Sequence, residues 1–153
     1  MTIQLQINDN QQTLYNKDYY QWLTHTAKLL KKKNFTQLDL ENLIEEIESL
    51  GRSEKRAIKS NLIVVILHLL KWRYQPQMRS NSWKSSIREH RRRIQELLTD
   101  SPSLKNQVPN VLADCYLAAK KQAGDETGLS AVVFPDECPF SLAESLDEDF
   151  LDK

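Results

Sequence analysis

The chain has 153 residues, which is long enough for one domain with a sizeable core, and its 40% apolar and 27% charged residues are typical of a globular protein. Three glycines are too few for a turn-rich β-sandwich or a glycine-lined nucleotide site. The formal net charge is zero, which disfavours a general nucleic-acid binder, because dedicated binders are usually basic.

The first half of the chain predicts a polar start followed by two helices. Residues 1–13 are polar and expected to be loosely ordered. From residue 14 to residue 153 we expect a single all-helical domain. The apolar period of 3.6 predicts a first helix that ends at Lys31–Lys33 and a second helix over Thr36–Leu50 with an apolar stripe. Gly51 is predicted to stop or bend this second helix, because glycine tolerates the left-handed cap conformation.

A third predicted helix begins near Ser53 and reaches about Trp72. It is apolar nearly all round between Leu62 and Leu70, which favours a central, buried position. Ser80 or Ser82 starts a fourth helix, with the hydroxyl as its N-cap.

Two further helices are predicted after the fourth. Pro109 fits the first turn of a fifth helix that runs to about Ala123 and is ended by Gly124 and Gly128. The pattern Ser141-x-x-Glu144 is typical of a capping box before a last short acidic helix. The sequence therefore predicts an all-α protein, a compact bundle of five to six helices around a buried third helix.

Cations are concentrated in the middle of this neutral chain. Residues 52–93 hold 12 of the 21 Lys and Arg but only two acids, Glu54 and Glu89. A block of this kind can hold an anionic partner, or it can face the chain's own acids.

The helical wheel divides the block. The fourth helix groups four cations beside its apolar stripe, Lys84, Arg88, Arg91 and Arg92. The second helix groups three carboxylates beside its own stripe, Glu41, Glu45 and Glu48. One interpretation is that these two charged flanks meet where the two helices pack together. A second is that the guanidinium groups bind phosphate, with Arg73 and Arg79 as secondary contacts. A third is that the cations contact a partner protein.

Aromatic side chains surround the same block. Trp72, Tyr74 and Trp83 bracket Arg73 and Arg79. Interleaved arginine and aromatic groups can grip single-stranded nucleic acid by stacking and charge. The alternative is that Trp72 and Trp83 fill the core where the third helix turns into the fourth.

His68 interrupts the most apolar stretch of the chain. One interpretation is a core histidine whose ring nitrogens find hydrogen-bond partners. The other is a general acid–base group beside Glu45 or Glu48, which would indicate a hydrolase or nuclease. The sequence has no recognised catalytic motif that would support an enzyme. It also has no metal-ligand spacing or cofactor signature, so neither a metal nor a cofactor is expected.

The chain is expected to be cytoplasmic, with no membrane segment. Its longest apolar run, Leu62–Leu70, is far shorter than the ~20 residues that span a bilayer. Met1–Asn10 lacks the basic and apolar regions of a signal peptide. In a reducing compartment Cys115 and Cys138 remain free thiols.

Several segments, in this order, closely resemble a bacterial family known only as domain of unknown function twenty-nine. The segments are Glu45–Glu54, His68–Pro76, Arg79–Trp83, Ile87–Arg91, Asp100–Leu104 and Phe134–Pro139. The resemblance covers about Leu14 to Phe150 and implies an all-helical, bacterial, cytoplasmic domain. It brings no reaction, cofactor or catalytic residues.

Three functions follow from these observations as hypotheses. The first is a non-enzymatic module that binds nucleic acid or a phosphorylated ligand through Lys84, Arg88, Arg91 and Arg92. The second is a helical module for protein–protein interaction or oligomerisation, which a contiguous exposed apolar patch would favour. The third is the hydrolase or nuclease built on His68.

Overall fold

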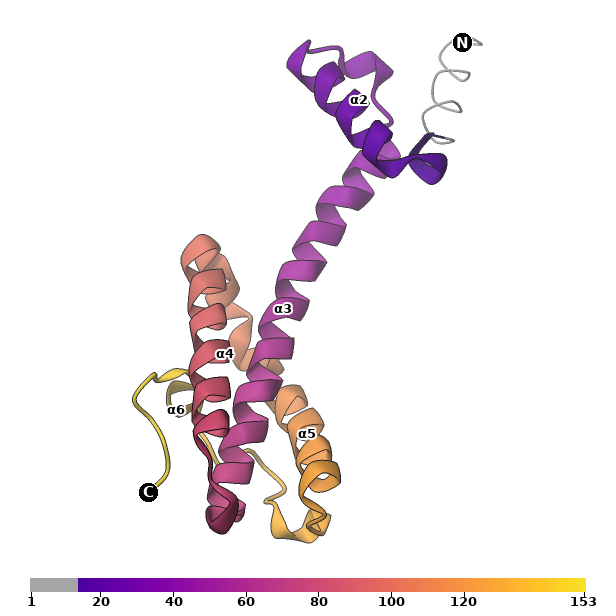
Figure 1. Cartoon of the computed structure of the whole chain (residues 1–153). Coiled ribbons are helices and arrows are strands. Elements are labelled where there is room, and N and C mark those ends of the chain that lie inside the picture. The colour runs from indigo at the N-terminus through magenta and orange to yellow at the C-terminus, as the bar shows by residue number, and fades with distance from the viewer. Residues whose placement is uncertain (1–13) are drawn as a thin grey trace. The chain divides into compact units, whose positions relative to one another are not determined.

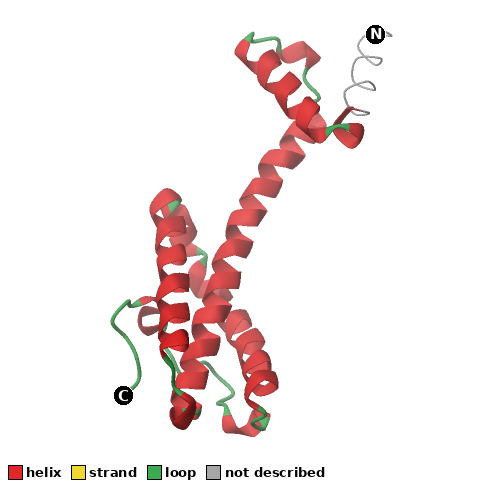
Figure 2. Cartoon of the chain, in the orientation of Figure 1, coloured by secondary structure: helices red, strands yellow, loops and turns green. Residues whose placement is uncertain are grey.

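The computed structural model describes residues 14–153, and these contain helices and loops but no strand (Figure 2). The all-α fold predicted from the sequence is confirmed. The expectation of a loosely ordered start at residues 1–13 lies outside the described residues. The chain divides into two compact units, Met1–Arg52 and Ser53–Lys153, which we describe separately.

The first unit is a helical hairpin. Asp18 is the N-cap of helix α2 (Tyr19–Lys31), and its carboxylate accepts a hydrogen bond of 2.9 Å from the backbone N–H of Gln21. A 3₁₀ turn, η1 (Phe35–Gln37), then leads to the start of helix α3 (Leu40–Tyr74). Few side chains are buried in this unit: Trp22, Thr26, Leu29, Leu38 and Asp39.

Helix α3 runs through Gly51 without a break, so the predicted stop or bend that separated a second from a third helix is wrong. The φ angle of Gly51 is not positive, unlike that of Gly128. A glycine inside a helix costs only about 1 kcal/mol relative to alanine. No proline lies between Leu40 and Tyr74, so the strong helix formers on both sides carry α3 across this weak position.

The second unit is built around the C-terminal part of α3. Helices α4 (Asn81–Asp100) and α5 (Val108–Thr127) lie on either side of it (Figure 1). Five α3 side chains have no exposed surface: Leu62, Val65, Ile66, Leu69 and Leu70. The prediction of a buried central helix is confirmed for this part of α3.

Local signals in the sequence place most of the remaining helix ends. The Ser80 hydroxyl caps α4, and Ser141 and Glu144 form the predicted capping box of α6 (Leu142–Leu146). Helix α5 runs past Gly124 and ends at Gly128, which adopts the left-handed conformation with φ of 71°. Within residues 14–153, no helix is long and apolar enough to cross a membrane.

Candidate functional site

Arg91, one of the four cations predicted to bind phosphate, is buried in the second unit with 4% of its surface exposed. Its guanidinium donates to three backbone carbonyl oxygens of the C-terminal segment (residues 141–153), those of Glu144 (3.0 Å), Ser145 (2.9 Å) and Phe150 (2.8 Å). Burial lowers the pKa of this guanidinium from its usual value. Arg91 therefore fastens the chain's own C-terminal segment.

The two predicted secondary contacts hold the same segment. The Arg73 guanidinium pairs with the Asp152 carboxylate, at 2.9 Å from Nη2 to Oδ1, and this hydrogen bonding raises the pKa of Arg73. Arg79 donates to the backbone oxygens of Trp72 (2.9 Å) and Lys153 (3.1 Å). Trp72 is buried and donates its indole N–H to the Asp152 carbonyl at 2.7 Å, so the structure gives Trp72 the core role.

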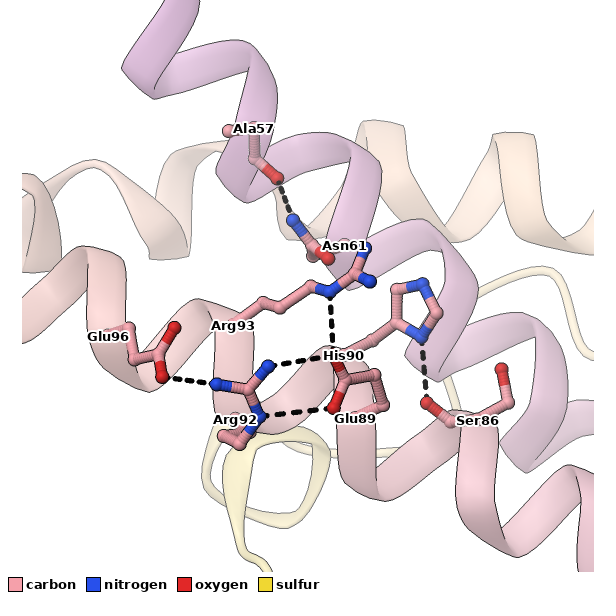
Figure 3. A network of polar contacts seen from close by, with 8 residues as sticks. All are labelled: Ala57, Asn61, Ser86, Glu89, His90, Arg92, Arg93 and Glu96. Atoms are coloured by element: carbon pink, nitrogen blue, oxygen red, sulfur yellow. Dashed lines mark hydrogen bonds and ion pairs between the residues drawn. The ribbon is translucent and has the colours of Figure 1, made fainter.

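Arg92 is held by carboxylates of its own helix. It pairs with Glu89, at 2.8 Å, and with Glu96, and Arg93 reaches the same Glu89 at 3.0 Å (Figure 3). These hydrogen bonds lower the pKa of Glu89 to about 2 and raise that of Arg92. The paired groups are well exposed to solvent, so the pairs contribute little stability, but they neutralise Arg92 of the cationic flank.

Lys84 and Arg88 are the two predicted cations for which neither a hydrogen bond nor an ion pair is described within residues 14–153. Both are exposed and line a cleft of about 220 Å³ between α4 and the C-terminal segment. Glu148 and Asp149 line the same cleft, so its charge is mixed. The Lys84 ammonium also lies 5.4 Å from the ring centroid of Trp72.

Two glutamates near the start of α3, Glu45 and Glu46, have partners inside the first unit. Glu45 pairs with Arg52 at 2.6 Å. The neighbouring Glu46 accepts hydrogen bonds of 2.5 Å from the hydroxyls of Tyr15 and Tyr19. Its hydrogen bond to Glu46 raises the pKa of Tyr15 to about 12. The described contacts therefore give no support to a seam between these carboxylates and the arginines of α4.

His68 is half-buried on α3, and its Nδ1 lies 2.8 Å from the backbone oxygen of Val64. Burial lowers the pKa of this imidazole. Glu45 and Glu48 belong to the first unit and His68 to the second, and residues of one helix meet only three or four positions apart. No described contact joins His68 to either glutamate, so the hydrolase hypothesis gains no support.

A cavity of about 440 Å³ in the second unit is lined by α5 and the segment around Cys138. Burial raises the pKa of the Cys138 thiol, so it is not an activated nucleophile. Across residues 14–153, no group of three or more His, Cys, Asp or Glu side chains could hold a metal ion.

The first unit exposes a large share of the apolar side chains. Of 13 large hydrophobic residues exposed in residues 14–153, nine lie between Tyr19 and Leu50. Four of them form a stripe along α3, and their exposed fractions are 59% (Leu40), 48% (Ile44), 61% (Ile47) and 66% (Leu50). Scattered exposed hydrophobics are ordinary, but a contiguous patch marks a site of interaction.

Helix geometry extends this stripe across the hairpin. Tyr19 contacts Glu46 and Trp22 contacts Asp39, so α2 and the start of α3 are antiparallel. At about 100° per residue, Leu23 and Leu30 lie to one side of the buried residues of α2. Because the two helices are antiparallel, that side of α2 is on the same side of the hairpin as the α3 stripe. We call these two leucines and the α3 stripe the apolar face.

A comparison with protein-family models gives a match over most of the chain. The family model described as "Domain of unknown function DUF29" matches residues 14–151. The chain belongs to this family. A search of curated proteins found no match, and neither did a search of solved structures. Since the description of DUF29 assigns no activity, the function of this DUF29 chain must be argued from its own residues.

Sequence reasoning identified the α3 stripe but expected an apolar stripe to pack inside the bundle. Periodicity alone could not have shown otherwise, because it marks an apolar side of a helix without saying what covers that side.

Proposed function

We propose that this protein is a helical protein–protein interaction module, and that the apolar face of the first unit is its binding surface. The observation that carries the proposal is the exposure of four large aliphatic side chains in a row on α3. Burying apolar surface is worth roughly 25 cal/mol per Å², so a partner that covers this stripe gains stability from each of these side chains. In contact with water, these side chains make no interaction that would compensate for their exposure.

A bacterial, cytoplasmic setting is part of this proposal. Cys115 and Cys138 are both free thiols in the described structure, as expected of a protein in a reducing compartment.

Photo-crosslinking in the native host tests the proposed function. A photoreactive phenylalanine analogue at position 47, in the α3 stripe, is expected to form adducts with a protein that covers the stripe. The same analogue at position 117 provides the control, because Leu117 is 58% exposed but lies on α5. Absence of any adduct at position 47, in cells where the chain is abundant, would falsify the proposal.

A second candidate function is the binding of an anionic partner, either nucleic acid or a phosphorylated ligand. Lys84 and Arg88 support it, because they are exposed, one helical turn apart and without a described carboxylate partner. Affinity for a single-stranded RNA should then fall steeply with salt. It should also fall in Arg88→Ala, whereas Arg92→Ala, which removes an already paired cation, should change it little. Undetectable binding at about 50 mM salt rules this candidate out.

A further inference from the structure

The apolar face has an acidic edge. Between Leu40 and Gly51, α3 carries four glutamates and neither lysine nor arginine. Glu48 is exposed, and no ion pair is described for it. On the helical wheel Glu48 borders the α3 stripe beside Ile44. A partner that covers the stripe would therefore place its own flank beside Glu48.

Among the described residues of this unit, no cation forms an ion pair with Glu48. Lys28 and Lys31 are exposed on the side of α2 opposite to its buried residues. Arg52, one helical turn beyond Glu48 on α3, pairs instead with Glu45, through side chains that are 47% and 57% exposed. Such an exposed pair is worth at most about 1 kcal/mol and is easily rearranged.

The same charges disfavour an antiparallel pairing with a second copy of this chain. If two α3 stripes met antiparallel, centred on the middle of Leu40–Leu50, the Glu48 flanks of both copies would lie on the same side of the seam. Like charges across a helix pair are repulsive and suppress a wrong partner.

We propose that the partner of the apolar face is an amphipathic helix of another protein, with an aliphatic stripe flanked by lysine or arginine. This inference rests on the proposed function. The aliphatic stripe of the partner would cover Ile44, Ile47 and Leu50, as in other helix-in-groove recognition. Its basic flank would lie beside Glu48 and fix the orientation of the bound helix through charge complementarity.

Binding of two synthetic peptides to the full chain tests this inference. Both are labelled amphipathic helices of about 18 residues with the same leucine stripe, and they differ only in a lysine or a glutamate flank. Fluorescence anisotropy at about 50 mM salt should give a Kd below about 1 mM for the lysine-flanked peptide. The affinity for the glutamate-flanked peptide should be at least about tenfold weaker.

Two charge reversals locate the contact. Glu48→Lys should weaken binding of the lysine-flanked peptide by about fivefold. Glu137→Lys provides the matched control, because Glu137 is an exposed glutamate of the second unit, and it should change nothing. Equal affinity for the two peptides, no detectable binding of the lysine-flanked one, or an unchanged affinity in Glu48→Lys overturns the inference.

The crosslinks from position 47 separate failure of this inference from failure of the proposed function. Adducts to another protein together with equal affinity for both peptides would leave the interaction module standing but remove the basic partner. Adducts only between copies of the chain would replace that partner with self-association. Absence of adducts removes both.

Discussion

At the residue scale, the arginines decide how the basic block is used. Three of the six predicted binding cations, Arg73, Arg79 and Arg91, contact the C-terminal segment, mostly through backbone carbonyls. The sequence identified the concentration of charge correctly. It could not show which arginines turn inward, because a carbonyl acceptor leaves no charge pattern in a sequence.

Arg91→Ala should destabilise the protein, because it leaves three carbonyl oxygens of the C-terminal segment without their donor. We expect a loss of about 3 kcal/mol in the free energy of unfolding, measured by urea denaturation. Arg88→Ala, an exposed arginine on the same helix, should change that free energy by no more than about 0.5 kcal/mol. Equal effects of the two substitutions would contradict the structural role of Arg91.

His68 should make stability depend on pH. Burial lowers the pKa of its imidazole in the folded state, so the unfolded chain binds a proton more readily. Its contribution to stability is complete above the unfolded pKa of about 6.5 and is lost as pH falls through the lower folded pKa. The nearby charged groups are Lys71, Glu126 and His90.

Urea denaturation at about pH 7.5 and pH 5.5 brackets the unfolded pKa and measures this dependence. Part of the loss of stability on acidification should disappear in His68→Gln. The pKa of Glu126 is lowered from 4.5 by its hydrogen bonds with Lys71 and Gln122, so this carboxylate titrates below the tested range. An identical pH dependence in His68→Gln and the unsubstituted protein would show that the imidazole is not desolvated.

At the element scale, glycine illustrates what a sequence pattern can and cannot decide. Gly51 and Gly128 both looked like helix ends, but only Gly128 is one. The serine and capping-box signals at Ser80 and Ser141 were reliable, because a side-chain hydrogen bond to a free backbone N–H specifies a helix start chemically. A glycine alone only permits a helix to end.

Replacing each glycine by alanine should give opposite results. Gly51→Ala should raise the free energy of unfolding by about 0.5–1 kcal/mol, because α3 is regular there and an added Cβ meets no atom within 4 Å. Gly128→Ala should lower it by about 1–2 kcal/mol, because φ is 71°. Thermal unfolding followed by circular dichroism compares the two, and a stabilising Gly128→Ala would mean that α5 ends differently.

At the scale of the whole molecule, the two units differ in how much apolar surface they bury. Periodicity predicted the core of the second unit well, because the C-terminal part of α3 is apolar on nearly all sides and must be enclosed. The first unit carries an equally regular stripe. Periodicity shows that a helix has an apolar side, but it does not say whether that side meets the same chain or another protein.

The central claim is that the α3 stripe is presented to a partner and is not part of the protein's own core. The most direct test is the free energy of unfolding of Ile47→Ala, compared with that of Ile66→Ala on the same helix. Ile66 has no exposed surface, so its truncation should cost about 2–5 kcal/mol. For Ile47, which is 61% exposed, we predict a change within about 0.5 kcal/mol. A loss in Ile47→Ala as large as that in Ile66→Ala would contradict the account.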